Sequence, residues 1–287
     1  MSSDLIPCAD RPGIQGTVRR VSDDPLTTRA RAIWGGADFL PIARSFAPGA
    51  EAFVGRLALQ PGEQVLDVAC GTGNLAIPAA RAGAAVTGVD IAPNLIEEAA
   101  VEAAAAGARV QFDVGDAEAL PYGDARFDVA MTMFGVMFAY RPERAAAELL
   151  RVVRPGGRIA MANWTPQGFI GHMLRAHVAV VPPPAGIPSP LAWGEESVVQ
   201  ARLGAGVADL AFTRRMMELR FPVPPAAVTE LFATFYGPTV ATLKAASAAG
   251  AVALRASLTR LFTEHNRATD GGTSVLGEFL EVQARVR

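Results

Sequence analysis

Short apolar runs alternate with helix-like segments through the middle of the chain. The pattern predicts strands at 65–69, 85–89, 110–114, 127–133 and 158–164, and helices at 74–82, 94–106 and 142–153. Gly83, Gly107 and Pro155 follow the three helices and are residues that end helices. Repeated strand–helix units indicate an α/β fold, in which a mostly parallel sheet carries helices on both faces.

The segments that flank this core have other patterns. Residues 1–28 are rich in Ser, Asp, Pro, Gly and Arg, which indicates a flexible N-terminal arm. Apolar residues recur at helical spacing over 29–59, with breaks at Gly35-Gly36, Pro41 and Pro48-Gly49. We expect two or three short helices there.

Residues 168–287 combine further helices with two more strands. Helices are expected at 168–181, 225–236 and 240–262, strands at 216–221 and 280–286, and a stiff proline-rich loop at 182–190. The expected organisation is an arm (1–28), a helical lid (29–59), a Rossmann-like core (60–167), and cap elements with the last two strands (168–287).

Composition narrows the class of protein. Apolar residue types form 51% of the 287 residues, enough for a sizeable core, and the formal net charge is only −2. This balance disfavours nucleic acid and membrane partners. The two cysteines, Cys8 and Cys70, lie far apart, and no metal-ligand spacing is present, so neither a disulfide scaffold nor a metal site is expected. Without a signal-peptide pattern or an apolar run of about 18 residues, we expect a cytoplasmic protein.

A glycine turn follows the first predicted strand of the core. The sequence Val65-Leu-Asp-Val-Ala-Cys-Gly-Thr-Gly-Asn74 carries a strand into Gly71-Thr72-Gly73, and a helix comes next. Glycines allow a tight turn and a close approach of a ligand to the backbone. Together with Ala76, they also satisfy a loose dinucleotide fingerprint, so the glycines alone leave a nicotinamide cofactor open.

Acidic residues at three successive strand ends discriminate between cofactors. Asp67 lies just before the glycine turn, Asp90 ends the second strand, and Asp116 follows the third. A carboxylate at Asp67 would repel a pyrophosphate but attract a cation. Asp90 can accept from two ribose hydroxyls, and Asp116 can accept from an adenine amino group. Each acid alone could be structural, as a buried acid or a cap, but the ordered series favours a phosphate-free, cationic nucleoside such as S-adenosylmethionine.

The chain resembles the class I S-adenosylmethionine-dependent methyltransferases, among them those that methylate ubiquinone and menaquinone precursors. The resemblance covers 60–165 and rests on the glycine turn, Val86-Thr-Gly-Val-Asp90-Ile91, Gly115-Asp-Ala-Glu-Ala-Leu-Pro121, Phe127-Asp128 and Glu148-Leu-Leu-Arg-Val-Val-Arg-Pro-Gly-Gly157. It implies a seven-stranded Rossmann-like sheet with an antiparallel last strand. It also implies a cofactor site made of Asp67, Ala69, Gly71, Thr72, Gly73, Asp90, Ile91, Asp116, Ala117, Met133 and Phe134.

The acceptor of the methyl group is expected to be a small molecule. Methyl transfer needs mainly in-line alignment and exclusion of water, and a base only where the acceptor is protonated. His172 is the candidate base, against a surface or capping histidine. Tyr140, Trp164, Trp193 and Tyr236 are candidates for an aromatic wall around the substrate, against simple core packing for each. Trp34 is a candidate lid residue over the cofactor, against a core tryptophan.

Three alternatives remain open at this stage. An enzyme of this fold could bind the cofactor and catalyse a cyclisation or a decarboxylation, because fold does not prove chemistry. A nicotinamide-dependent oxidoreductase would explain the glycines but not Asp67. A non-catalytic binding protein would not need the ordered acids. The expected assembly is a monomer or a homodimer.

Overall fold

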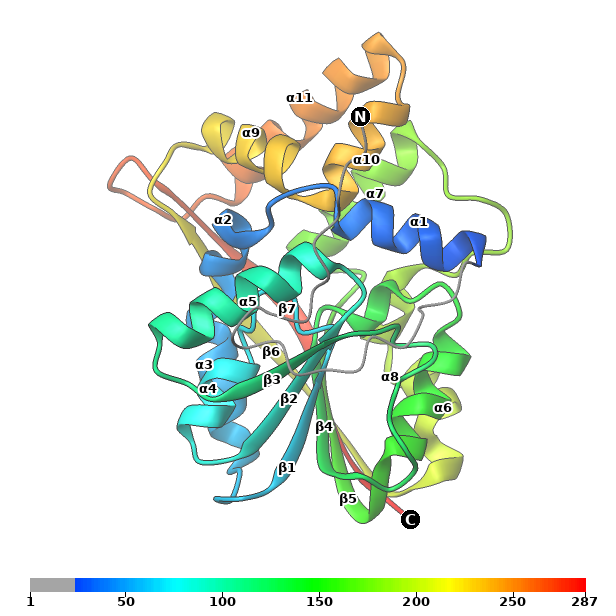
Figure 1. Cartoon of the computed structure of the whole chain (residues 1–287). Coiled ribbons are helices and arrows are strands. Elements are labelled where there is room, and N and C mark those ends of the chain that lie inside the picture. The colour runs from blue at the N-terminus through cyan, green and yellow to red at the C-terminus, as the bar shows by residue number, and fades with distance from the viewer. Residues whose placement is uncertain (1–23) are drawn as a thin grey trace, which may run out of the picture.

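One seven-stranded sheet runs through the whole molecule (Figure 1). The computed structural model describes residues 24–287. The strands lie in the order β3-β2-β1-β4-β5-β7-β6. Their bounds are β1 Gln64–Val68, β2 Ala85–Asp90, β3 Val110–Val114, β4 Phe127–Met133, β5 Val153–Trp164, β6 Val207–Phe221 and β7 Thr273–Val286. Only the pairings that involve β7 are antiparallel, which confirms the expected fold class.

Helices cover both faces of the sheet and its upper edge. In Figure 1, α3–α5 lie on one side of the sheet and α6 and α8 on the other. The helices are α1 Pro25–Trp34, α2 Leu40–Ala43, α3 Ala47–Leu57, α4 Ala76–Arg81, α5 Pro93–Ala105, α6 Pro142–Val152, α7 Phe169–Val180, α8 Glu196–Leu203, α9 Pro225–Phe235, α10 Gly237–Ala245 and α11 Ala248–His265. Short 3-10 turns are η2 Arg44–Phe46, η3 Val136–Phe138, η4 Pro190–Gly194 and η5 Gly204–Gly206.

The central strands read as continuous apolar runs because both of their faces are covered. Val65, Leu66 and Val68 of β1 are fully buried, and so is the carboxylate of Asp67 between them. In the parallel register, Asp67 lies beside Gly88 of β2 and Met131 of β4. Because β2 and β4 are the two neighbours of β1, the carboxyl ends of these three strands meet at one edge of the sheet.

A helical cap lies above the carboxyl ends of the strands (Figure 1). Its helices α9–α11 are inserted between β6 and β7, and α1 and α2 pack against α10 and α9 respectively. None of the helices within 24–287 is long and apolar enough to cross a membrane.

Several expected boundaries are wrong. Helix α1 begins at Pro25, capped by the Asp24 side chain, so the end of the expected arm is helical, while residues 1–23 lie outside the described part of the chain. The helix expected at 240–262 is two helices, broken where Ser247 caps α11. The last two strands are much longer than expected, β5 begins before Gly156-Gly157, and helix α8 was not predicted at all.

Candidate functional site

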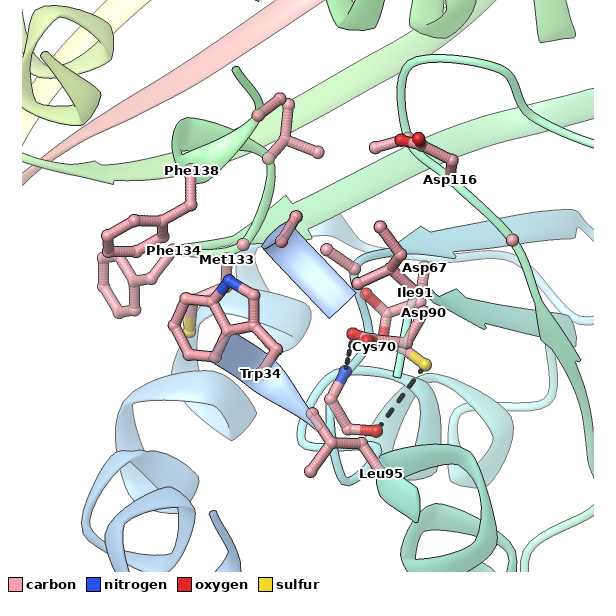
Figure 2. A pocket seen from close by; sticks show the side chains of 18 of the residues that line it. Trp34, Asp67, Cys70, Asp90, Ile91, Leu95, Asp116, Met133, Phe134 and Phe138 are labelled. Carbon is pink, nitrogen blue, oxygen red and sulfur yellow. Dashed lines mark hydrogen bonds between the residues drawn. The ribbon is translucent and has the colours of Figure 1, made fainter. Parts of the chain in front are cut away.

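A pocket (Figure 2) opens at the carboxyl ends of β1, β2 and β4, and Thr27, Ala30 and Trp34 of α1 also line it. Eleven of the twelve residues expected at the cofactor line it: Trp34, Asp67, Ala69, Gly71, Thr72, Asp90, Ile91, Asp116, Ala117, Met133 and Phe134. Gly73 does not line the pocket, but its positive φ of 88° completes the turn below it. Of the expected substrate residues, only Tyr140 reaches the pocket.

The glycine turn aims backbone groups and side chains at the pocket. Ala69 and Gly71 have positive φ values of 56° and 53°, conformations that glycine adopts without strain and alanine does not. The Gly71 amide donates to Asp90 Oδ2 over 2.9 Å, drawn as a dashed line in Figure 2. The turn after β1 is thereby tied to the end of β2.

Asp67 is a buried acid with an unused acceptor. Its side chain is 1% exposed, and Oδ2 has no hydrogen-bond partner within 24–287. Burial raises the pKa of Asp67 to about 8, and the nearby Asp90 adds to the rise, against a hydrogen bond from the Ala76 amide. At neutral pH this carboxyl therefore holds a proton, unless a cation enters the pocket beside it.

Asp90 is held by two backbone amides. Its Oδ1 accepts from Ala92 over 2.9 Å, and its Oδ2 accepts from Gly71. Burial raises the pKa of Asp90, and these hydrogen bonds oppose the rise. Each carboxylate oxygen has a second lone pair, so both can also accept from ribose hydroxyls.

Asp116 connects the pocket to the N-terminal helix. Its Oδ1 accepts from the Glu118 amide, and its Oδ2 accepts from Thr27 Oγ1 of α1, both over 2.9 Å. A second connection lies beside it, because Arg141 pairs with both Asp24 (2.7 Å) and Glu118 (2.9 Å). The start of α1 is thus fastened at the end of the pocket where an adenine ring is expected.

Aromatic side chains form the opposite side of the pocket. Figure 2 shows Trp34, Phe134 and Phe138 together, with Met133, away from Asp67, Asp90 and Asp116. Phe39 and Phe46 complete this group of five rings, which we call the aromatic chamber: Trp34, Phe39, Phe46, Phe134 and Phe138.

The other predicted substrate residues lie behind this lining. Trp164 is 2% exposed and stacks on the far side of Phe134, with ring centroids 3.6 Å apart. Tyr236 is buried and packs edge-on against Trp34. Trp193 is buried in η4 beneath the guanidinium of Arg202, 4.5 Å from its ring. Trp164 and Tyr236 therefore contact rings of the chamber from outside the pocket, whereas Trp193 has no ring contact with the chamber within residues 24–287.

The predicted base has no place at the pocket. His172 is exposed on α7, and its Nδ1 meets Arg175 over 2.9 Å. His177, on the buried side of the same helix, contacts Met173 O and Thr239 Oγ1 instead. His172 therefore does not line the pocket and is not its base.

Several lining residues were not anticipated from the sequence. They are Thr27, Ala30, Phe39, Phe46, Cys70, Asn74, Leu75, Leu95, Gly115, Glu118, Gly135, Val136, Phe138 and Ala139. Phe39 and Phe46 carried a helical signal that predicts core packing equally well. Cys70, Gly115 and Glu118 lie inside the two motifs that identified Asp67 and Asp116, and their place beside those acids could have indicated them.

Gly135 allows the ends of β1 and β4 to approach each other. A Cβ at this position would lie 2.5 Å from Ala69 Cβ and 2.8 Å from the Ala69 carbonyl. Gly135→Ala is expected to force the two strand ends apart, to lower stability by about 1–3 kcal/mol and to weaken cofactor binding about fivefold. Gly123→Ala is the matched control, because nothing lies within 4 Å of its added Cβ. Calorimetric binding that is equal for both variants would contradict this role.

The Thr27–Asp116 hydrogen bond makes a separate prediction. Thr27→Val is expected to destabilise the free protein by about 1–2 kcal/mol, because it leaves a buried carboxylate oxygen unpaired. An adenine amino group at Asp116 would restore that partner, so S-adenosylhomocysteine should raise the Tm of the variant more than that of the wild type. Thr28→Val, an exposed change on the same helix, is the control. Equal Tm shifts in all three proteins would argue against adenine at Asp116.

Two buried polar atoms in the pocket lack hydrogen-bond partners that S-adenosylmethionine could supply. Asp67 Oδ2 and Thr72 Oγ1 are both buried at the pocket and lack a partner within residues 24–287. An ammonium group would satisfy the first, and a carboxylate or amine the second. Asp90 and Asp116 then lie where ribose and adenine are expected.

The comparisons with known proteins agree with this geometry. A family model described as a methyltransferase domain matches residues 65–157. An uncharacterised protein of Mycobacterium tuberculosis is 38% identical over 225 residues, which cover 76% of this chain and 80% of that protein. A demethylmenaquinone methyltransferase of Renibacterium salmoninarum is 32% identical over 168 residues, covering 53% of this chain and 68% of that enzyme.

Solved structures share the fold. The YcgJ protein from Bacillus subtilis has a TM-score of 0.56 at 20% identity, covering 84% of this chain and 99% of its own. The [4+2]-cyclase SpnF has a TM-score of 0.52 at 25% identity, covering 84% of this chain and 81% of its own. Motif order, pocket and relatives converge, and the chain belongs to the class I S-adenosylmethionine-dependent methyltransferases.

Proposed function

We propose that this methyltransferase acts on a small, flat and apolar molecule that enters the aromatic chamber. The observation that carries the proposal is the division of one pocket into an acidic side and an aromatic side. Asp67, Asp90 and Asp116 would hold the donor, with Met133 and Phe134 at the boundary between the two sides. One relative is named a demethylmenaquinone methyltransferase, which supports a small organic molecule as the acceptor.

Orientation is the main contribution that these residues would make. Bound S-adenosylmethionine supplies an activated methyl group on a sulfonium. Asp67 and Thr72 would fix the amino-acid end of the donor, and Asp90 would fix the ribose. The rings of the chamber would align the acceptor and exclude water, and such positioning accounts for much of the acceleration in reactions of this kind.

The cover of the pocket would move during the cycle. Trp34 lies at the end of α1, and the start of α1 is fastened through Thr27 and Arg141. We propose that the N-terminal helices over 29–59 form a lid that opens for exchange of donor and product. We further propose a cytoplasmic monomer or homodimer that acts without a nucleic acid or membrane partner, in keeping with a net charge of −2.

Label transfer tests the proposed reaction. The purified protein would be incubated with methyl-labelled S-adenosylmethionine and a small-molecule extract, and products would be separated by mass. Labelled methyl in an apolar product, with matching release of S-adenosylhomocysteine, is the expected result. Conversion of an extract component without label, while the cofactor stays intact, would instead indicate the cyclisation or decarboxylation alternative.

A thermal-shift comparison tests the oxidoreductase alternative. S-adenosylhomocysteine at 100 times its dissociation constant should stabilise the protein by about 2.7 kcal/mol, and NAD(H) should not stabilise it. Stabilisation by NAD(H) alone would overturn both the donor assignment and the proposed function.

A further inference from the structure

The five rings of the aromatic chamber form a continuous wall. Neighbouring ring centroids are separated by 6.0 Å between Phe134 and Phe46, 6.2 Å between Phe46 and Phe39, 6.1 Å between Phe39 and Trp34, and 5.1 Å between Trp34 and Phe138. All five line the pocket. A wall of five rings offers aromatic surface to an acceptor as well as to the sulfonium.

Phe134 in this wall is held by a backbone hydrogen bond and by ring stacking. Phe134 follows β4 with a φ of 58°, a conformation that is strained for a bulky residue. Its amide donates to Ala162 O over 2.9 Å, and its ring lies 8° from parallel to Trp164. One face of Phe134 is therefore occupied by Trp164, and its position beside Met133 is held by both contacts.

The charges that line the pocket are negative. Among residues 24–287, the lining groups that ionise are Asp67, Asp90, Asp116 and Glu118, with Cys70 and Tyr140. Glu118 is paired with Arg141, so its charge is offset. Burial, with Asp67 and Asp90 nearby, raises the pKa of the Cys70 thiol well above its usual range, which keeps it neutral.

Aromatic faces and acids both favour positive charge and disfavour negative charge. The quadrupole of each ring attracts a cation to its face, by about 0.5–2 kcal/mol for each contact depending on desolvation. An anionic acceptor, such as a phenolate or an enolate, would be repelled by the negative potential of each ring face that it contacts. A neutral acceptor would meet no such penalty. When the methyl group is transferred to it, the positive charge would remain next to the ring faces, which attract cations.

We infer that the acceptor atom is a neutral, weakly basic nitrogen, tertiary or within an aromatic ring, on a flat apolar skeleton, and that the product is a cation held by the aromatic chamber. This inference rests on the proposed function. The nitrogen gives its lone pair to the new N–CH₃ bond as the S–CH₃ bond breaks. The bonding pair returns to sulfur, which becomes a neutral thioether, and the positive charge moves to nitrogen. No proton has to be removed, so no general base is needed.

The test compares three probes of the same shape and different charge. N-methylquinolinium is the cation, 1-methylnaphthalene its neutral counterpart, and 1-naphthoate the anion. Each would be titrated into wild-type protein saturated with S-adenosylhomocysteine, with binding followed by quenching of the tryptophan fluorescence and by calorimetry. The cation is expected to bind about tenfold more tightly than the neutral probe, the size of one well-placed cation–π contact, and the anion is expected to bind least.

Two variants assign the preference to the chamber. Phe39→Leu and Trp34→Leu should reduce the ratio of cation to neutral affinity about threefold or more, because each removes one ring face. Phe212→Leu on β6 is the matched control: its ring is also half-buried but does not line the pocket, and the ratio should be unchanged. Calorimetry is the readout for Trp34→Leu. If a variant does not fold, the order of the three affinities in the wild-type protein still tests the inference.

The outcomes separate this inference from the proposed function. Binding of S-adenosylhomocysteine is measured first, in the same protein, and its absence would overturn the proposed function. If S-adenosylhomocysteine binds but the neutral probe or the anion binds as tightly as the cation, the inference about nitrogen is wrong and the methyltransferase proposal survives. If the cation binds most tightly but the ratio of cation to neutral affinity is unchanged in both chamber variants, the inference about nitrogen is also wrong.

Discussion

Asp67→Asn is expected to weaken S-adenosylmethionine binding by about 2–3 kcal/mol, roughly 30–150-fold, in the range for a lost interaction with a charged group. The same change is expected to stabilise the protein without cofactor. Both effects come from one buried carboxyl, which is 1% exposed and has an unpartnered Oδ2. The carboxylate is unfavourable in the empty pocket and favourable next to a cation, and an amide is neutral in both situations.

The sign of the stability effect follows from the raised pKa. Asp67 has a pKa of about 8 in the folded protein, against an ordinary value of 3.8, so the folded state binds the proton more tightly than the unfolded state. Stability is therefore lost as the pH rises from about 4 to about 8. Asparagine removes this loss, so at pH 8 the variant should be more stable than wild type by up to about 5 kcal/mol, because a pKa difference of about four units is worth 1.36 kcal/mol per unit.

Calorimetry and thermal unfolding at pH 8 would measure the two effects side by side. Asp113→Asn is the control for both, because Asp113 is also buried at the sheet, bonds to Gln111 and Tyr122, and does not line the pocket. An Asp67→Asn protein that binds the donor as tightly as wild type would show that Asp67 does not face the cation.

Asp90→Asn is expected to weaken cofactor binding by about 1.5–3 kcal/mol, roughly 10–150-fold, and to lower stability as well. Asp90 uses one oxygen for the Gly71 amide and the other for the Ala92 amide. An asparagine has only one acceptor oxygen, so its amino group must face one of these N–H donors. The glycine turn should loosen from the end of β2, and one ribose hydroxyl should lose its acceptor.

Asp90→Asn should bind the cofactor more weakly even under conditions in which the variant is fully folded. Affinity for S-adenosylhomocysteine would be measured at a temperature well below the Tm of the variant, where nearly all of the protein is folded. Asp113→Asn should keep wild-type affinity under the same conditions. Unchanged affinity of Asp90→Asn would refute the assignment of Asp90 to the ribose.

The donor side of the pocket could be predicted because parallel strands bring their carboxyl ends together. Asp67 and Asp90 lie at the carboxyl ends of β1 and β2, and Asp116 follows β3. The order of these strands in a Rossmann-like sheet is regular, so the positions of the three acids along the chain determine their positions in space. The glycine turn carried a similar local signal, and the positive φ values of Gly71 and Gly73 agree with it.

The acceptor side could not be predicted in the same way. Phe39 and Phe46 have apolar periodicity whether they face a core or a cavity, and only the packing of the cap on the sheet decides between these. Trp164 was expected at the pocket, but the left-handed turn at Phe134 places a second ring in front of it. His172 is at the right end of its helix, but the phase of α7 turns it to solvent and turns His177 inward.

Proton release on binding tests the central role of the acidic side most directly. S-adenosylmethionine would be titrated at pH 7 into wild type and Asp67→Asn, each in two buffers of different ionisation enthalpy. The comparison between proteins cancels the titration of the cofactor itself. Because Asp67 has a pKa of about 8 without cofactor, wild type should release nearly one proton more per molecule bound than the variant. Equal proton release by the two proteins would contradict the account.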